Sequence, residues 1–189
     1  MLDGLKARLR LNEGIVRYMY LDTKGNVAVG IGHLLATAND AAELPFLKPG
    51  SGPPPTAQDI RYAWQTIRQM KPGMPLVVYS MRCIYRLDAK FVDDLLDRDI
   101  QAHLNSARVW LPEIATYPEP AQEAILDIDF NCIGGIGGFP VLCVFAKAGN
   151  WGACANNCHR EGASESRNKS TRELFLQAAQ EDAKAEVQF

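Results

Sequence analysis

The sequence predicts a mainly helical α+β fold with one small antiparallel β-sheet near the N-terminus. Apolar residues first recur at helical spacing, then alternate as in a strand over residues 15–21, and return to helical spacing after residue 56. Residues 22–26 have turn-forming chemistry and separate the alternating run from a shorter extended one at 27–29. With 189 residues, 47% of them hydrophobic, the chain can bury one substantial core or two small lobes that share one.

The first predicted element is a short amphipathic helix that ends at Glu13. Leu2, Leu5 and Leu9 fall at positions i, i+3 and i+7, which places them on one helical face. Gly14 follows Glu13 directly and is a helix stop signal. We therefore expect an acidic side chain at the C-terminal end of this helix.

The predicted hairpin follows, with Asp22 at its bend. The β-branched and aromatic residues of 15–21 suit a strand, and extended structure resumes at 27–29. Gly30 and Gly32 then give a backbone that can approach another group closely. This is a reason to expect a ligand beside residues 30–34.

A proline-rich region comes next, because seven of the eleven prolines lie between Pro45 and Pro75. The triple proline at 53–55 excludes a helix there, so residues 44–55 are predicted to form a surface loop. Thr56, with Asp59 three positions later, resembles a capping box and predicts the start of a helix. Its apolar face comprises Ile60, Ala63, Trp64, Ile67 and Met70.

A long helix is predicted from Asp88, as N-cap, to Arg108. At 1.5 Å per residue it would span about 31 Å, enough to cross from one lobe to another. His103 near its end is expected to be structural or solvated. The inward stripe is expected to contain Phe91, Leu95, Ile100 and Leu104.

The rest of the chain is predicted to be helical. Pro118 and Pro120 mark a new start, and 121–132 has mostly helical register before two glycine pairs end it. Three more helices are expected at 139–147, 151–158 and 170–187, which brings the total to roughly seven helices and one small sheet.

Composition excludes several classes of function. A net charge of −2 and a pI near 5.9 give no basic footprint for nucleic acid. No apolar run approaches the ~20 residues of a membrane span, and residues 1–14 lack the apolar core of a secretory signal. We expect no stable membrane insertion.

The five cysteines form no C-x-x-C pair and cannot all be bonded to one another. Cys154 and Cys158 stand at i, i+4 on an expected helix, so buried free thiols are favoured over a disulfide. His103 and His159 complete no recognisable zinc-ligand set. No metal and no cofactor is expected.

Glu13 and Asp22 are candidates for a pair of catalytic carboxylates. In glycosidic bond cleavage, one carboxyl group protonates the leaving oxygen and the other assists attack by water. Their spacing of nine residues sets no distance by itself, and acids in a hairpin are more often solvated surface groups.

Residues 11–35 resemble the phage-type lysozymes, the T-even phage lysozyme-like family, also called glycoside hydrolase family 24. That family has a first helix ending in Glu-Gly, then Tyr-x-Asp-x-x-Gly, then Gly-x-Gly-His. These motifs stand here as Glu13-Gly14, Tyr20-Leu-Asp22-Thr-Lys-Gly25 and Gly30-Ile-Gly32-His33. The resemblance continues more thinly along the chain, except in the proline-rich region, which reads as an insertion.

The resemblance implies a single lysozyme-like, two-lobed domain over 1–189 with a hinged substrate cleft between the lobes. The N-terminal lobe would cover about 12–87, including the insertion at about 45–85, and the bridging helix about 88–108. The helical C-terminal lobe would cover about 109–189 together with the first helix.

The resemblance also implies roles for individual residues. Glu13 would be the general acid, and Asp22 the carboxylate that holds or activates the attacking water. Arg167 would pair with the catalytic glutamate, although Lys169 or Arg172 could take that role. The sugar cleft would be lined by Gly32, Leu34, Phe130 and Asn131, while His33 is chiefly structural in the family.

One position departs from the family pattern. A threonine stands six residues after the aspartate in the family, and here that position is Ala28. A methyl group cannot orient a water molecule, so hydrolysis that depends on the hydroxyl should be weakened or rerouted. Asn26 lies two residues earlier, on the same side of an ideal strand, and its amide is a candidate substitute. Thr23 offers a hydroxyl, but in the turn.

The expected function is therefore a muramidase that hydrolyses the β-1,4 bond between N-acetylmuramic acid and N-acetylglucosamine in peptidoglycan. Two alternatives stay open: a lytic transglycosylase that needs Glu13 alone, and a wall-binding module that has lost turnover through Ala28. We expect a monomer that is made in the cytoplasm and acts in the periplasm, as a phage endolysin or an interbacterial effector. For an effector, an immunity protein or a component of a secretion machine is the expected partner.

Overall fold

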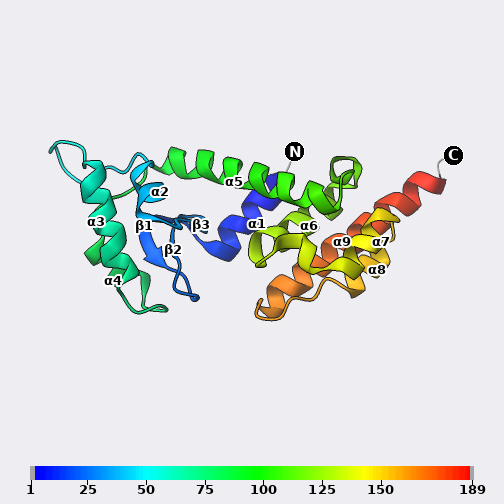
Figure 1. The fold of residues 1–189 in the computed structure, drawn as a ribbon. Helices are drawn as coiled ribbons and strands as arrows, with labels where there is room; N and C mark the ends of the chain where they lie inside the picture. Colours follow the sequence, from blue (N-terminus) through cyan, green and yellow to red (C-terminus); the bar gives the residue numbers. More distant parts are fainter. Residues whose placement is uncertain (1–2, 188–189) are drawn as a thin grey trace. The chain divides into compact units, whose positions relative to one another are not determined.

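The computed structural model describes residues 3–187 and is mainly helical with one small sheet (Figure 1), so the predicted α+β class is confirmed. Two 3₁₀ turns, Ile114–Thr116 and Gly135–Gly138, accompany the helices and strands. The described part contains α1 Asp3–Glu13, β1 Val16–Leu21, β2 Val27–Gly30, β3 His33–Leu34, α2 Ala38–Ala42, α3 Ala57–Arg68, α4 Leu76–Arg82, α5 Ala89–Trp110, α6 Glu119–Asn131, α7 Pro140–Lys147, α8 Trp151–Asn156 and α9 Glu165–Val187.

The chain divides into two compact units. The sheet unit runs from residue 13 to 99, and the helical unit combines the start of the chain, up to residue 12, with residues from 100 onward. The boundary falls inside the sequence of α5. None of the described helices is long and apolar enough to cross a membrane.

The sheet has three antiparallel strands in the order β1-β2-β3. Tyr20 pairs with Ala28, and Ala28 pairs with Leu34 on its other side. The predicted hairpin is confirmed. Strand β3 adds a third strand to it, which was not predicted because two residues are too few to show an alternating pattern. Gly32, at φ +76°, allows the tight turn between β2 and β3.

Helix α3 begins where its capping box predicted. The Thr56 side chain accepts a hydrogen bond from the Asp59 backbone N–H, and the Asp59 carboxylate accepts one from the Thr56 backbone N–H. Ile60, Ala63 and Ile67 are buried, which confirms most of the predicted apolar face. Met70 was placed on that helix, but α3 ends at Arg68.

Two short helices of the sheet unit, α2 and α4, were not predicted. Helix α2 has a capping box of its own, formed by Thr37 and Asp40. Helix α4 lies in the proline-rich region, and its sequence LVVYSMR contains two β-branched residues. The loop before α3 is exposed over 48–54, as predicted, and one isolated β-bridge joins Leu47 to Arg86.

Helix α5 confirms the predicted start after Asp88, whose Oδ1 accepts a hydrogen bond from the Lys90 backbone N–H at 2.9 Å. Its predicted inward stripe is partly wrong. Phe91 and Leu104 are only half-buried. The side chains that are buried are Val92, Leu95, Leu96, Ile100 and Ala107.

In the helical unit, α6 packs against α9, and α8 packs against α9 as well. Helix α6 is buried on nearly every side from Pro120 to Asp129. Helix α9 begins at Glu165, five residues before the predicted start, and α8 ends at Asn156. Cys158 therefore lies outside the helix on which it was expected.

All five cysteines are free thiols, and four of them are buried, with Cys132 half-buried. Burial raises the pKa of Cys154 to about 12, and the neighbouring thiols Cys158 and Cys143 add to the shift. These thiols therefore stay protonated at neutral pH, as apolar core groups do.

Candidate functional site

Glu13 is the last residue of α1 and is half-buried. Gly14 follows at φ +72°, a conformation that ends the helix and lets the chain turn into β1. The sequence therefore places this carboxyl group at the junction of a helix and a strand, as predicted.

Asp22 lies at the bend of the hairpin, where three donors hold its carboxylate. Its Oδ1 accepts hydrogen bonds from the backbone N–H groups of Lys24 at 2.9 Å and Asn26 at 2.7 Å. Its Oδ2 accepts one from the Asn26 side-chain amide at 3.0 Å. The backbone N–H of Asp22 also donates to the Asn26 carbonyl. The turn thus fixes the direction of both carboxylate oxygens.

Tyr20 experiences the negative charges of both acidic residues. Burial, followed by the negative charges of Glu13 and Asp22, raises the pKa of the Tyr20 phenol to about 12. The negative charges of both carboxylates therefore act on the same hydroxyl group. That hydroxyl stays protonated and can donate a hydrogen bond across the whole neutral range.

Ala28 is directly opposite Tyr20 in the sheet, so the two side chains share one face. Its methyl group is 4% exposed. Leu34 is opposite Ala28 on β3 and is half-exposed, and Gly32 forms the preceding turn. The structure thus gathers Tyr20, Ala28 and Leu34 on one face of the sheet, with no hydroxyl at the Ala28 position itself.

His33 forms a separate contact in the same unit. Its Nδ1 lies 2.9 Å from Asp99 Oδ1 and 3.0 Å from Oδ2, and both side chains are half-buried. This contact ties β3 to α5, in keeping with a structural role.

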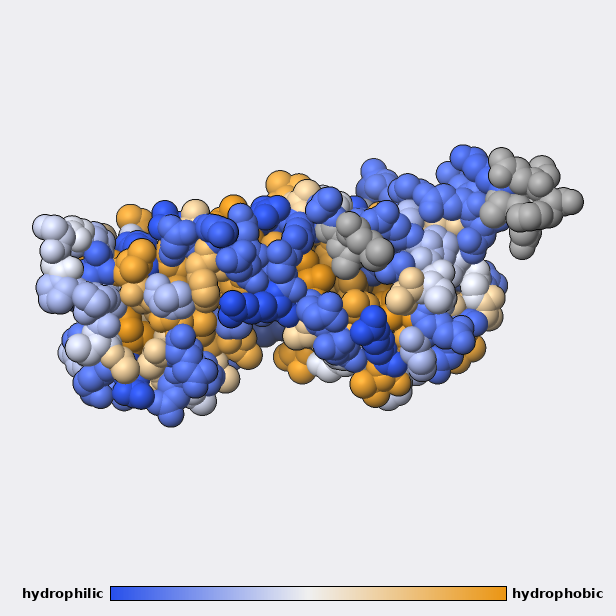
Figure 2. All heavy atoms as spheres, turned by 90° about the horizontal axis from the view of Figure 1, so that it is seen from above, coloured by the Kyte–Doolittle hydropathy of each residue, from blue (hydrophilic) through white to orange (hydrophobic). Residues whose placement is uncertain are grey.

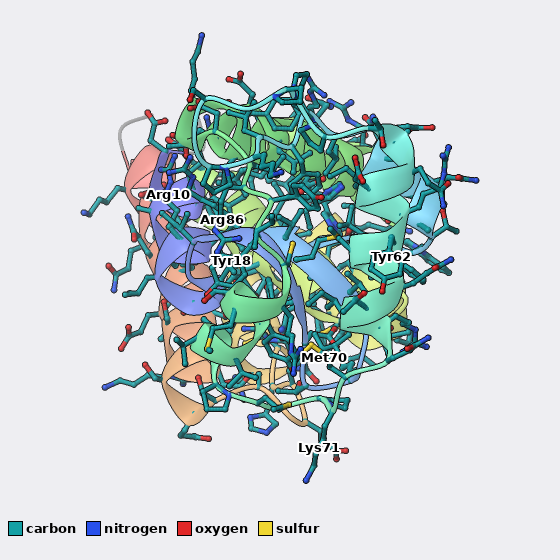
Figure 3. All side chains as sticks on the ribbon, turned by 90° about the vertical axis from the view of Figure 1, so that its left-hand side faces the viewer. Arg10, Tyr18, Tyr62, Met70, Lys71 and Arg86 are labelled. Atoms are coloured by element: carbon teal, nitrogen blue, oxygen red, sulfur yellow. The ribbon has the colours of Figure 1, made fainter. Side chains whose placement is uncertain are left out.

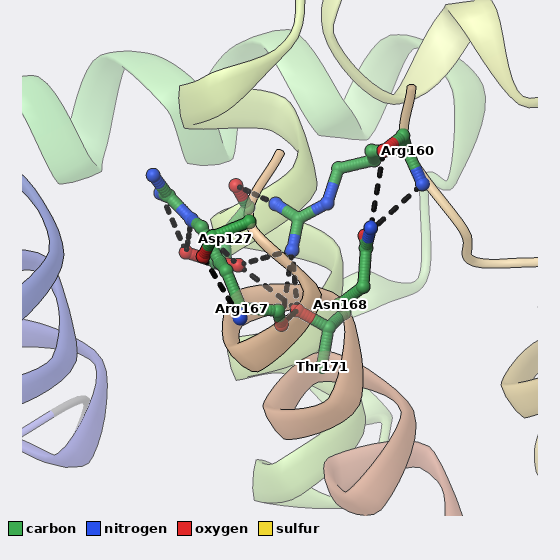
Figure 4. Close-up of polar contacts among 6 residues, drawn as sticks. Asp127, Arg160, Arg167, Asn168 and Thr171 are labelled. Atoms are coloured by element: carbon green, nitrogen blue, oxygen red, sulfur yellow. Dashed lines mark hydrogen bonds and ion pairs between the residues drawn. The ribbon is translucent and has the colours of Figure 1, made fainter. Parts of the chain in front are cut away.

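In the helical unit, Arg167 belongs to a buried network around Asp127 (Figure 4). Arg167 donates from Nη2 and Nε to Asp127 Oδ1, at 2.8 and 3.1 Å. Arg160 Nη2 lies 2.9 Å from Asp127 Oδ2, and the Thr171 hydroxyl is 3.0 Å from the same oxygen. All four side chains are at most 8% exposed.

The cations of this network lower the pKa of Asp127 more than its burial raises it. Burial alone would raise the pKa of the Asp127 carboxyl, but the hydrogen bonds and positive charges of Arg167 and Arg160 hold that pKa below its usual range. The pairing fixes the Arg167 side chain where α9 begins, a position supported by the hydrogen bond from its backbone N–H to Ser164 Oγ.

Phe130 and Asn131 are the last two residues of α6, and both are half-buried. The Phe130 ring packs against the His103 ring at a centroid distance of 4.6 Å. His103 Nδ1 lies 2.8 Å from Asp129 Oδ2, which gives His103 the structural surroundings expected of it. The alternative cations differ from Arg167, since Lys169 and Arg172 are both exposed.

Sequence reasoning did not single out Asp127. A carboxylate in the apolar run AILDIDF must be paired with a cation, and that signal could have found it. Nothing in the sequence could identify the cations, which stand 33 and 40 positions later. Tyr20 was noted only as a motif residue, and its relation to both acids depends on the sheet register.

No protein-family model matches this chain, and no curated protein shows significant similarity to it. Among the described residues, no group of three or more His, Cys, Asp or Glu side chains is arranged to hold a metal ion. The function is therefore inferred from the residues of the two units.

Proposed function

We propose that this protein is a muramidase that hydrolyses the β-1,4 bond between N-acetylmuramic acid and N-acetylglucosamine. The observation that carries the proposal is that the sheet unit holds two carboxyl groups, Glu13 and Asp22, just before and just after β1, the strand that contains Tyr20. Here Asp22 is held by three donors and Glu13 ends a helix.

In the proposed reaction, Glu13 donates a proton to the glycosidic oxygen as the bond between that oxygen and C1 of the muramic sugar breaks. Water attacks C1 and gives its proton to Asp22. The products are a free reducing muramic end and a glucosamine residue with a new hydroxyl group.

Asn26 is proposed to act on Asp22 and not directly on the water molecule. Its side-chain amide donates to Asp22 Oδ2, so it orients the carboxylate that holds the water. It is thus a positioning residue for Asp22. The protonated Tyr20 hydroxyl, on the same sheet face as Ala28, is proposed as a substitute for the missing threonine hydroxyl.

The remaining residues of the proposal come from the family resemblance. Arg167 is proposed as the arginine of the catalytic set. Gly32, Leu34, Phe130 and Asn131 are proposed to bind the sugars. The substrate places the site of action in the periplasm, reached as an endolysin or as an effector with an immunity protein as partner.

Ala28 favours one second candidate, a lytic transglycosylase. Without the threonine hydroxyl that would help Asp22 to hold the water, the 6-hydroxyl of the muramic sugar can attack its own C1 while Glu13 first protonates the leaving oxygen and then accepts the hydroxyl proton. The product is a 1,6-anhydromuramic end, and no water is consumed.

Mass spectrometry of digested peptidoglycan distinguishes these reactions. Reducing muramic ends indicate hydrolysis, anhydro ends indicate the transglycosylase, and the absence of soluble fragments indicates a wall-binding module. We expect reducing ends, and a loss of turnover of at least about 100-fold in Glu13→Gln, because removal of a general acid typically costs that much. Glu43→Gln, an exposed glutamate of the same unit, is the matched control. Wall lysis by Glu13→Gln at the wild-type rate would refute the proposal.

The same digests test the role of Asn26. We expect Asn26→Ala to lower turnover by roughly 10-fold with little change in KM, because the loss of one hydrogen bond frees Asp22 Oδ2 to reorient. Asn39→Ala, at an asparagine on α2, serves as the control. Undiminished wall-lytic activity of Asn26→Ala would exclude the assigned role.

A further inference from the structure

Helix α4 exposes its apolar side chains instead of burying them. The exposed fractions are 44% for Leu76, 61% for Val77, 76% for Met81 and 45% for Ile84 just beyond the helix. Apolar residues are visible elsewhere on the surface, including the face drawn in Figure 2. Nowhere else in the described residues do four large exposed ones stand within nine positions.

Two of these side chains form a stripe along the helix. Val77 and Met81 are spaced i and i+4, which places them next to each other on one helical face, and Ile84 follows in the extended segment after α4. The opposite side of α4 is anchored by Tyr79, which is fully buried. We call Leu76, Val77, Met81 and Ile84 the α4 patch.

The orientation of the α4 patch is fixed by hydrogen bonds. The Tyr18 hydroxyl donates to the Leu76 carbonyl at 3.1 Å, and the Tyr79 hydroxyl donates to the Lys71 carbonyl at 2.7 Å. The Arg86 guanidinium donates to the Ser80 and Cys83 carbonyls and lies over the Tyr18 ring, 4.4 Å from its centroid (Figure 3). Exposure of the patch is thus a property of the folded helix and is not caused by fraying.

The surroundings of the α4 patch are basic. Residues 60–87 contain five cations and no Asp or Glu, in a chain whose net charge is −2. None of these cations pairs with a carboxylate of the described residues. Lys71 precedes α4 and Arg82 is its last residue; both are exposed, and Lys71 points away from the ribbon in Figure 3.

We propose that the α4 patch, with Lys71 and Arg82, docks the protein on the surface of a bilayer that contains anionic phospholipids. The occupant must be anionic and apolar at once, because the patch supplies cations and aliphatic side chains and no carboxylate. A bilayer surface offers both headgroup phosphates and adjacent acyl chains at every point, so a narrow stripe is sufficient for contact. This is peripheral docking, without a membrane-spanning segment.

The test is cosedimentation of the full chain with phospholipid vesicles. We expect at least ~10-fold tighter binding to vesicles of phosphatidylethanolamine with phosphatidylglycerol than to vesicles of phosphatidylcholine, because each cation near an anionic surface contributes about fivefold. The preference should weaken as salt rises from low to physiological concentration.

Two double variants separate the apolar and charged parts. Val77→Asp with Met81→Asp removes the stripe, and Lys71→Glu with Arg82→Glu reverses the flanking charges; each should weaken vesicle binding at least ~10-fold. The matched controls, expected to stay within about twofold, are Val141→Asp with Val144→Asp, at exposed valines of α7, and Lys147→Glu with Lys184→Glu. Circular dichroism and thermal unfolding verify that each variant folds.

Several outcomes would overturn the docking proposal. Equal binding to both kinds of vesicle, no binding to either, or equal loss in variants and controls would do so. A dimer in sedimentation velocity that the α4 variants dissociate, without vesicle binding, would assign the patch to a second copy of the chain. Cleavage of soluble glycan fragments should be unchanged in the α4 variants, so failure of docking leaves the muramidase proposal untouched.

Discussion

Asp127 shows how one residue can determine the surroundings of another. Its carboxylate is 2% exposed. Burying this negative charge without cations beside it would be strongly unfavourable. Arg160 and Arg167 supply the charge, and the Thr171 hydroxyl lies beside the second oxygen. Arg167 is also a proposed site residue. The buried ion pair with Asp127 therefore determines the position of a side chain that we propose to be functional.

We expect Asp127→Asn to lower the free energy of unfolding by about 3–5 kcal/mol at pH 6, because it leaves two buried guanidinium groups without a counter-charge. The folded pKa of Asp127 is lowered, so its contribution is present above the unfolded pKa of about 3.9 and is lost as pH falls through the folded value. Urea unfolding between pH 6 and pH 2.5 should therefore show a steeper acid loss in the wild type than in the variant.

The matched control is Asp94→Asn, an exposed carboxylate of α5, which should change the free energy of unfolding by no more than about 0.5 kcal/mol. An equal acid dependence in wild type and Asp127→Asn would show that the network does not titrate as described. If Asp127→Asn does not fold, Thr171→Val probes the same oxygen with a smaller perturbation.

Among single residues, the sequence identified those whose immediate neighbours in the chain predict their surroundings. Glu13 precedes a glycine and Asp22 stands in a turn, and the structure places each in that local setting. Asp127 carries only the signal of a charge in an apolar run, which does not identify its partners, and Tyr20 carries none. Their surroundings come from α9 and from the strand partner Ala28, which only tertiary pairing brings close.

At the scale of elements, local chemistry determined which boundaries could be predicted. The capping box at Thr56 gave the start of α3, and Gly14 gave the end of α1. Asp88 similarly marks the start of α5. In each case the residues that end or cap the helix are within four positions of the boundary. The capping interaction can therefore be recognised from the sequence alone.

Elements stabilised by distant partners could not be predicted in this way. Helix α4 has no side-chain cap and depends on Tyr18, from β1, which donates to the Leu76 carbonyl 58 positions away. Strand β3 is two residues long and exists through its pairing with β2. The start of α9 at Glu165 was missed because its first turn is polar, and its burial comes from Arg167, Asn168 and Thr171 contacting α6 and the preceding loop.

At the scale of the whole molecule, the order of elements along the chain differs from their grouping in space. Helix α1 precedes β1 directly, but residues up to 12 group with the helical unit that resumes at residue 100. The Leu5 backbone N–H donates to Glu123 Oε1 at 3.0 Å, and Arg8 forms an ion pair with the same carboxylate. Leu9 is fully buried. The N-terminal helix therefore contributes to the core that the C-terminal half builds.

This grouping predicts where a core mutation in α1 acts. Leu9→Ala should cost about 2–5 kcal/mol, because it leaves a cavity at a fully buried position. Hydrogen exchange should then accelerate mainly in α6 and α9, although β1 is much closer in sequence. Met19→Ala, at a fully buried position of β1, is the matched variant, and its effect should concentrate in residues 13–99. If Leu9→Ala accelerated exchange in β1 and β2 as much as in α6 and α9, the two units would unfold together and α1 would not belong to the helical unit alone.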